Sequence, residues 1–230
     1  MPIYVIGDIH GCSKQLKEMC KKIKFNKATD KVIFLGDYID RGPDSYGVIK
    51  FIQRKQRQFG RKRIVALRGN HEQMAIDALK YPKEIHLFYG NGGCATVRSY
   101  EQNGAQLIDD LKWFESLPIM HEEEYFIAVH AGLNPQFDIS NQQEMDMLWI
   151  REEFHKAPEG TFNKPVLFGH SITHYYFEEG YGFVPVLVNG NLALDTGCVA
   201  AGHLTCAILE GSQVTGFLAV IGRTHEGQSK

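Results

Sequence analysis

The chain has 230 residues, of which 43% are hydrophobic and 23% charged, as is usual for a folded protein with one sizeable core. Its formal net charge of −2 argues against general nucleic-acid binding, which usually needs an excess of basic residues. The five cysteines include no C-x-x-C pair, so reduced thiols in a cytoplasmic protein are expected, not a disulfide framework or a zinc ribbon. No run of about 18 apolar residues occurs, and no membrane-spanning segment is predicted.

Short apolar runs rich in β-forming residues alternate with helical patterns along the first 170 residues. These runs cover residues 2–6, 31–35, 63–67, 124–129 and 165–168. The first run reads as a strand and not as a signal peptide, because neither a basic segment nor a long apolar stretch accompanies it. Strands that alternate with helices predict α/β layers, with reactive groups at the carboxyl ends of the strands.

The pattern changes after residue 180. Four short strands separated by Asn-Gly and Gly-Ser turns are predicted there: residues 184–188, 191–195, 203–210 and 213–221. We expect these antiparallel strands to complete a second sheet, which gives an α/β (α+β) sandwich of two mixed sheets flanked by helices. Residues 72–117 combine helical patterns with a Gly/Asn cluster, and we interpret them as a small helical cap inserted into a single domain of residues 1–230.

Each of the five early runs stops at a short polar cluster. The clusters are GDIHG at residues 7–11, GDYIDRG at 36–42, RGNHE at 68–72, HAG at 130–132 and GHS at 169–171. Any one of them could be structural, since an Asp or Asn can cap the next helix and a lone His after a strand is more often structural than a ligand. Five strand ends that all carry carboxylate, imidazole or amide groups together indicate one binuclear metal site.

The order GDxHG, GDxxDRG, GNHE, HAG and GH resembles the PPP-type metallophosphoesterases. That family includes protein serine/threonine phosphatases, the bacteriophage lambda phosphatase and symmetrical diadenosine tetraphosphate hydrolases. The resemblance spans residues 7–170, implies the metallophosphoesterase-type sandwich, and is far more specific for the superfamily than for a substrate. One departure concerns residues 199–202, which lack a tyrosine that many relatives carry there, so the resemblance does not imply that substrate contact for this chain.

The resemblance also implies roles for individual residues. The implied metal ligands are Asp8, His10, Asp37, Asn70, His130 and His170, with Asp37 bridging the two ions. The implied phosphate-binding residues are Arg41, Arg68 and Arg151. His71 is expected to be the general acid that protonates the leaving oxygen, and Asp40 is expected to orient it.

The chemistry of a phosphate ester explains why such groups are needed. Two divalent cations lower the pKa of a shared water enough to give a nucleophile near neutral pH. The leaving alkoxide needs a proton, hence a histidine that binds no metal, and arginines stabilise the phosphoryl oxygens. The mixed Asp, His and Asn ligand set favours Mn, with Fe or Zn as alternatives, over Mg.

The leading hypothesis is a serine/threonine protein phosphatase, with phosphorylated proteins or small phosphoesters as substrates. Symmetrical hydrolysis of diadenosine tetraphosphate is the alternative. The histidine at position 10 leans towards the phosphatase, because dinucleotide hydrolases often show glutamine there. A catalytically silent phosphate-binding scaffold is less favoured because every expected ligand and His71 are present, and a nuclease would need a basic surface that the composition does not supply.

Overall fold

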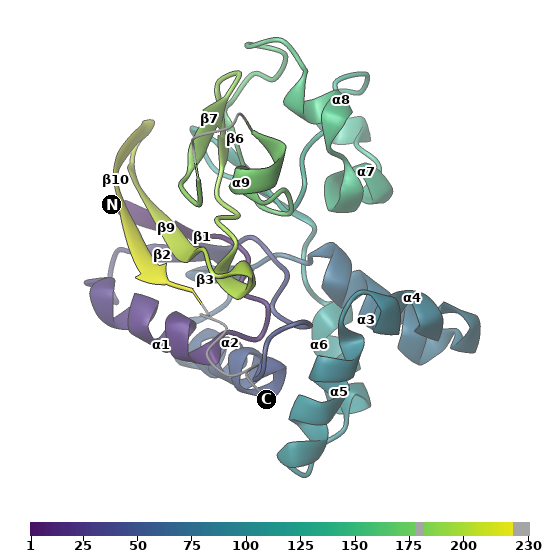
Figure 1. The fold of residues 1–230 in the computed structure, drawn as a ribbon. Helices are drawn as coiled ribbons and strands as arrows, with labels where there is room; N and C mark the ends of the chain where they lie inside the picture. The colour runs from purple at the N-terminus through teal and green to yellow at the C-terminus, as the bar shows by residue number, and fades with distance from the viewer. Residues whose placement is uncertain (178–181, 223–230) are drawn as a thin grey trace.

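The computed structural model describes residues 1–177 and 182–222, in which ten strands form two five-stranded sheets (Figure 1). The single-domain interpretation also covers residues 178–181 and 223–230, which lie outside the described part. The first sheet contains, in spatial order, β10 (Gln213–Ile221), β9 (His203–Glu210), β1 (Pro2–Ile6), β2 (Lys31–Phe34) and β3 (Ile64–Ala66). The second contains β4 (Met120–Glu122), β5 (Ile127–Val129), β6 (Val166–Phe168), β8 (Asn191–Ala193) and β7 (Val186–Val188). The predicted class of two mixed sheets flanked by helices is confirmed.

The central strand β1 is apolar throughout because both of its faces are buried. Tyr4 and Ile6 face the helices, whereas Val5 packs between the two sheets with Leu167 and Leu192 of the second sheet. Successive side chains of a strand point to opposite faces, so a strand covered on both sides reads as a continuous apolar run. This layer of apolar residues joins the sheets into a sandwich.

The expectation that all four late strands complete the second sheet is wrong for β9 and β10. β9 pairs antiparallel with β1, placing Ala207 opposite Val5, and β10 continues the first sheet at its edge. β9 fits there because Leu204 and Cys206 reach the helical side of the sheet while Ala207 and Leu209 enter the layer between the sheets. In the second sheet β8 runs parallel to β6, whereas β7 pairs antiparallel with β8.

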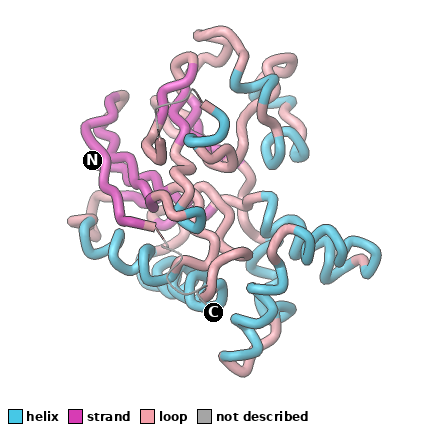
Figure 2. Tube along the Cα trace, in the orientation of Figure 1, coloured by secondary structure: helices cyan, strands magenta, loops and turns pink. Residues whose placement is uncertain are grey.

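Some helices cover the outer faces of the sheets, and others form a separate group beside them. The helix α1 (Ser13–Lys22) and the helix α2 (Ser45–Phe59) pack on the first sheet through one apolar core. The next group consists of α3 (Asn70–Lys80), η1 (Pro82–Glu84), α4 (Ile85–Gly90), α5 (Gly93–Gln102), η2 (Leu107–Asp110) and α6 (Leu111–Glu115). Figure 2 shows this group gathered on one side of the molecule, away from the strands. The remaining short helices are η3 (Ile139–Asn141), α7 (Glu144–Trp149), α8 (Glu152–His155), α9 (Thr173–Tyr176) and η4 (Cys198–Ala200).

Strand direction places the polar clusters together. β1, β2 and β3 are mutually parallel, as are β5, β6 and β8. Within each sheet the loops after these strands therefore leave from the same edge, where the carboxyl ends of the strands lie. The two sheets approach each other closely here, since a Cβ added at Gly7 would lie 2.2 Å from the carbonyl oxygen of Leu194. Within residues 1–177 and 182–222, no helix combines the length and apolar character that crossing a bilayer requires.

Candidate active site

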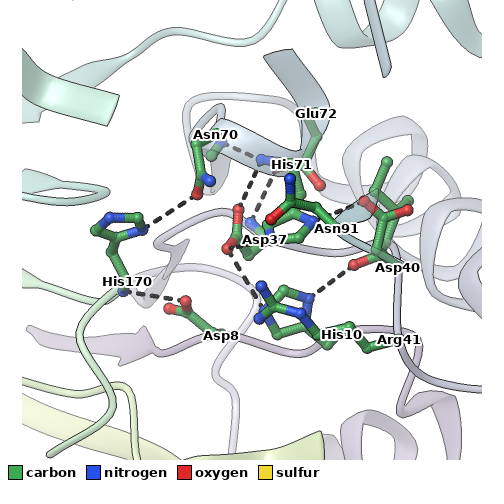
Figure 3. Close-up of polar contacts among 12 residues, drawn as sticks. Asp8, His10, Asp37, Asp40, Arg41, Asn70, His71, Glu72, Asn91 and His170 are labelled. Carbon is green, nitrogen blue, oxygen red and sulfur yellow. Dashed lines mark hydrogen bonds and ion pairs between the residues drawn. The ribbon is translucent and has the colours of Figure 1, made fainter. Parts of the chain in front are cut away.

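Side chains that follow five strands converge in one cluster, and Figure 3 labels those that follow β1, β2, β3 and β6. They are Asp8 and His10 after β1, Asp37 after β2, Asn70 and His71 at the start of α3 after β3, His130 after β5, and His170 after β6. All of them are buried, and none exceeds 7% exposure. Burying this many polar and ionisable groups is costly unless each finds a partner or a bound ion.

Asp37 lies at the centre of the cluster. Its carboxylate oxygens are 3.5 Å from His10 Nε2, 3.4 Å from His130 Nε2 and 3.9 Å from His71 Nε2. Two groups of possible metal ligands, His10–Asp37–His71 and Asp37–His130–His170, therefore share this one carboxylate. Burial alone would raise the pKa of Asp37, but the surrounding imidazoles outweigh it and hold the pKa below its ordinary value. Asp37 is thus ionised and placed to serve two sites.

Around Asn70, atoms that carry lone pairs face one another. His130 Nδ1 donates to the carbonyl oxygen of Leu35 at 2.9 Å, which leaves Nε2 with its lone pair. That Nε2 lies 2.9 Å from Asn70 Oδ1, which is also 3.2 Å from His170 Nδ1 and 3.3 Å from both carboxylate oxygens of Asp37. With the amide turned over, Asn70 Nδ2 would donate to His130 Nε2, His170 Nδ1 and Asp37. With Oδ1 facing inward, the acceptors are favourable when a cation stands among them, and this ligand set suits a divalent metal ion.

The other side of the cluster presents a further imidazole lone pair, on His10, and two buried atoms without a partner among the described residues, on Asp8 and His170. His10 Nδ1 donates to the carbonyl oxygen of Ile39 at 2.8 Å, so its Nε2 is directed into the site with its lone pair. Asp8 accepts from the backbone N–H of His170 at 3.0 Å, while Asp8 Oδ1 and His170 Nε2 are buried without a partner in the described part of the chain. Burial and the nearby Asp195 raise the pKa of Asp8. A bound cation would satisfy these atoms and relieve the repulsion between the carboxylates.

His71 differs from the other imidazoles because a carboxylate holds its ring. Its Nδ1 lies 2.6 Å from Asp40 Oδ2, and both residues are buried. Burial lowers the pKa of His71, but Asp37 and Asp40 outweigh it, so the pKa lies above its ordinary value. By contrast, burial lowers the pKa of His10 and that of His130. One imidazole is therefore suited to carry a proton, and the others are suited to offer a lone pair.

Two of the three predicted phosphate-binding arginines lie at the cluster. Arg41 Nη1 is 2.9 Å from His10 Nε2, so its guanidinium reaches the edge of the site. Arg151 lies over the ring of Tyr176, 5.1 Å from its centroid, and its charge adds to burial in lowering the pKa of His170. These positions leave two guanidinium groups near the central ligands.

Arg68 does not join them. Its guanidinium donates to Gln73 Oε1 at 2.9 Å and to Glu144 Oε1 at 3.0 Å. It also donates to the backbone carbonyl oxygens of Glu115 and Leu117 at 2.9 and 3.2 Å. The expectation that Arg68 clamps phosphate therefore conflicts with this geometry, because these four bonds tie it to α3, α7 and the end of α6.

Backbone strain is concentrated at the cluster. In the described part of the chain, seven residues other than glycine have positive φ, and five of them belong to the cluster: His10, Asp37, Asp40, Arg41 and His170, with φ between +44° and +72°. Each such conformation costs on the order of 1–3 kcal/mol and persists only where its surroundings impose it. The positions of these side chains therefore come at the expense of some folding stability.

Two buried residues that the sequence left without a role hold this backbone. Glu72 accepts hydrogen bonds from the backbone N–H groups of Asp37, Tyr38 and Gly69 at 2.8–2.9 Å. Its position as the third residue of α3, where Glu commonly caps a helix start, is a signal that could have identified it. Thr96 donates to Asp40 Oδ1 at 2.6 Å from a helix 56 residues further along the chain, and no sequence pattern announces that contact.

Comparisons with known proteins agree with this geometry. The family model described as calcineurin-like phosphoesterase matches residues 1–205. Serine/threonine-protein phosphatase 1 of Salmonella typhimurium is 29% identical to this chain over 90% of the chain and 92% of that protein. The symmetrical bis(5'-nucleosyl)-tetraphosphatase of Nitrosospira multiformis is also 29% identical, over 82% of the chain, which spans only 64% of that enzyme's length. A solved structure described as a proposed diadenosine tetraphosphatase superposes with a TM-score of 0.70 over 96% of this chain and 94% of its own, at 22% identity, a likeness of fold alone. The chain therefore belongs to the calcineurin-like phosphoesterase family of metal-dependent hydrolases, as its PPP-type motif order predicted.

Proposed function

We propose that this phosphoesterase is a serine/threonine protein phosphatase that uses two divalent ions, with Mn preferred. The proposed ligands are Asp8 and His10 for one ion, Asn70, His130 and His170 for the other, and Asp37 for both. The shared carboxylate of Asp37 and the unpartnered oxygen of Asp8 support this assignment. Imidazole ligands favour Mn, Fe or Zn over Mg. The helices of residues 72–117 are proposed to be a cap on a single domain.

The residues of the chain supply binding and proton transfer. When bound, the two ions supply a water acidic enough to act as a nucleophile near neutral pH. His71 donates the proton that the leaving serine or threonine oxygen needs, and Asp40 fixes its ring through Nδ1. Arg41 and Arg151 hold the phosphoryl oxygens, whose negative charge their guanidinium groups match.

The observation that carries the choice of a peptide substrate is a groove of about 700 Å³ between α3, α4 and α7. The groove lies next to the site, because its lining residue Trp149 packs edge-on against His170 with ring centroids 5.9 Å apart. The charged lining residues are Asp77, Lys83, Glu84 and Glu144. Even with Arg68 paired to Glu144, they offer no excess positive charge to hold a polyphosphate chain.

The apolar lining of the same groove suits peptide side chains. Tyr81, Leu87 and Met145 line it and are 53%, 50% and 68% exposed. An exposed apolar cleft beside a catalytic centre is typical of a surface that binds the flanking residues of a substrate. The match to nearly the full length of the Salmonella phosphatase supports the same choice.

The test compares two substrates on one preparation. Metal-stripped protein receives Mn, Zn, Mg or no metal, and kcat/KM is measured on a phosphothreonine peptide with basic and apolar flanking residues and on diadenosine tetraphosphate. We expect Mn-dependent hydrolysis, at least about tenfold faster on the peptide. A higher kcat/KM on the dinucleotide would favour the tetraphosphatase alternative, which the Nitrosospira relative supports. Stoichiometric metal binding without activity on either substrate would favour the silent scaffold. Asp37→Asn is the control, since losing this carboxylate should abolish Mn-dependent activity.

A further inference from the structure

The first turn of α5 contacts Asp40, the carboxylate that holds the ring of His71. Thr96 is completely buried, and its Oγ1 lies 2.6 Å from Asp40 Oδ1 and 2.8 Å from the backbone nitrogen of Asp40. Four residues earlier, the carbonyl oxygen of Gly92 accepts from the backbone N–H of Arg41 at 3.3 Å. Figure 3 shows Asp40 and Arg41 together on one side of the site. The helical group of residues 72–117 therefore reaches the catalytic centre through this turn.

Counting hydrogens fixes the direction of each bond. Thr96 has one hydroxyl hydrogen, and it is donated to Asp40 Oδ1. Its lone pairs then accept from the backbone N–H of Asp40 and from Ser45 Oγ at 3.0 Å. The second carboxylate oxygen of Asp40 remains for His71 Nδ1, at 2.6 Å. Both oxygens of the carboxylate are thereby occupied, and its plane is fixed.

The backbone under Asp40 needs such support. Asp40 and Arg41 have φ of +72° and +64°, a left-handed conformation that residues other than glycine adopt only when neighbouring groups impose it. Thr96 and Gly92 bond to the backbone N–H groups of these two consecutive residues. The turn is also closely packed, because a Cβ added at Gly92 would lie 2.9 Å from Arg41 Cγ. The start of α5 thus determines both the turn and the carboxylate that it presents.

We propose that Thr96 is a positioning residue for proton transfer, which acts through Asp40 to aim the His71 ring at the leaving oxygen. The inference rests on the proposed role of His71 as the general acid. Loss of the Thr96 hydroxyl leaves the metal ligands untouched and allows the Asp40 carboxylate to rotate. The consequence is selective, because poor leaving groups depend on the proton from His71 and good leaving groups do not.

The test uses Thr96→Val, which keeps the shape of the side chain and removes the hydroxyl, and Thr96→Ser, which keeps the hydroxyl. Each Mn-loaded variant is assayed on a phosphoserine peptide and on p-nitrophenyl phosphate, whose nitrophenolate needs little protonation. We expect Thr96→Val to lower kcat on the peptide by about tenfold or more and kcat on p-nitrophenyl phosphate by less than about threefold. Thr96→Ser should keep kcat on the peptide close to that of the unmodified chain, and the amount of bound Mn should be the same in all variants. If Thr96→Val does not fold, Thr96→Ala compared with Thr96→Ser gives the same contrast.

Ser99→Ala is the matched control. Ser99 is a buried hydroxyl on the same helix, and it accepts from the backbone N–H of Tyr46 at 3.1 Å instead of contacting Asp40. An equal loss on both substrates in Thr96→Val, a selective loss in Ser99→Ala, or no loss in Thr96→Val would overturn the proposal. His71→Asn separates the two levels of the argument. If His71→Asn lowers kcat equally on both substrates, the proposed role of His71 is wrong, and so is the role of Thr96 that depends on it. If it is selective and Thr96→Val is not, only the role of Thr96 is wrong.

Discussion

Gly69 offers a direct test of how tightly the site is built around Asp37. Its backbone, with φ −93° and ψ 174°, is open to any residue, so replacement by alanine has a purely steric effect. The added methyl carbon would lie 2.2 Å from Asp37 Oδ1, 2.5 Å from the backbone nitrogen of Asp37 and 2.9 Å from Glu72 Oε2. Asp37 cannot yield freely, because its N–H is bonded to Glu72 at 2.9 Å.

The cost of Gly69→Ala follows from these contacts. Overpacking of this kind costs about 1–3 kcal/mol, which lowers the Tm of a chain of this size by about 2–12 °C. Displacing the Asp37 carboxylate by about 1 Å should lower kcat by about a hundredfold and weaken Mn binding. Thermal unfolding with and without Mn, a Mn titration and kcat on p-nitrophenyl phosphate measure the three effects.

Gly90→Ala is the matched control, because a Cβ at Gly90, the last residue of α4, meets nothing within 4 Å. It should leave Mn binding and kcat unchanged and raise stability by at most about 1 kcal/mol. A Gly69→Ala protein with the Mn affinity and kcat of the unmodified chain would refute the view that this carboxylate is sterically locked in place.

Four further outcomes follow from the structure. Chelation of the metal should abolish activity and lower Tm. Mn at a hundred times its Kd should restore about 2.7 kcal/mol of stability, measured by thermal unfolding. A Tm and a rate that do not depend on metal would contradict the proposed ligands. Arg41→Ala should weaken inhibition by inorganic phosphate by about tenfold or more, since charge-assisted hydrogen bonds contribute about 1.5–3 kcal/mol; an unchanged inhibition constant would remove Arg41 from the phosphate site. Phe168→Ala should cost about 3–5 kcal/mol in urea unfolding, because this fully buried ring packs edge-on against Phe154 with centroids 4.9 Å apart. Burial and Arg151 lower the pKa of His155 to about 4. The unfolded chain therefore protonates this imidazole at a higher pH than the folded chain does, and the free energy of unfolding falls as pH drops from about 6.5 towards 4. His155→Gln should remove up to about 1 kcal/mol of that decline in urea titrations at pH 7.5, 6 and 5, and curves for the two proteins that remain parallel would contradict it.

The sequence determined the elements and the chemistry wherever these depend on local composition. β1 was predictable because burial on both faces makes Tyr4, Val5 and Ile6 apolar in succession. β4, from Met120 to Glu122, was not predicted, because a strand at the edge of a sheet is only partly buried and leaves no apolar run. The polar clusters after the strands were recognisable because metal and phosphate chemistry requires particular residue types at fixed spacing. The convergence of Asp8, Asp37 and their neighbours followed, because parallel strands end at the same edge.

Only the tertiary structure decided which distant groups meet. The late hairpin could have extended either sheet, and it joined β1 because both faces of β9 carry residues that fit the two apolar layers there. Arg68 lies in a motif next to Asn70, yet its guanidinium is bonded away from the site, and residue type does not reveal such a direction. Thr96 contacts Asp40 across 56 residues of chain. Hydrogen bonds of this kind depend on the packing of whole helices against the site, and no local pattern in the sequence encodes that arrangement.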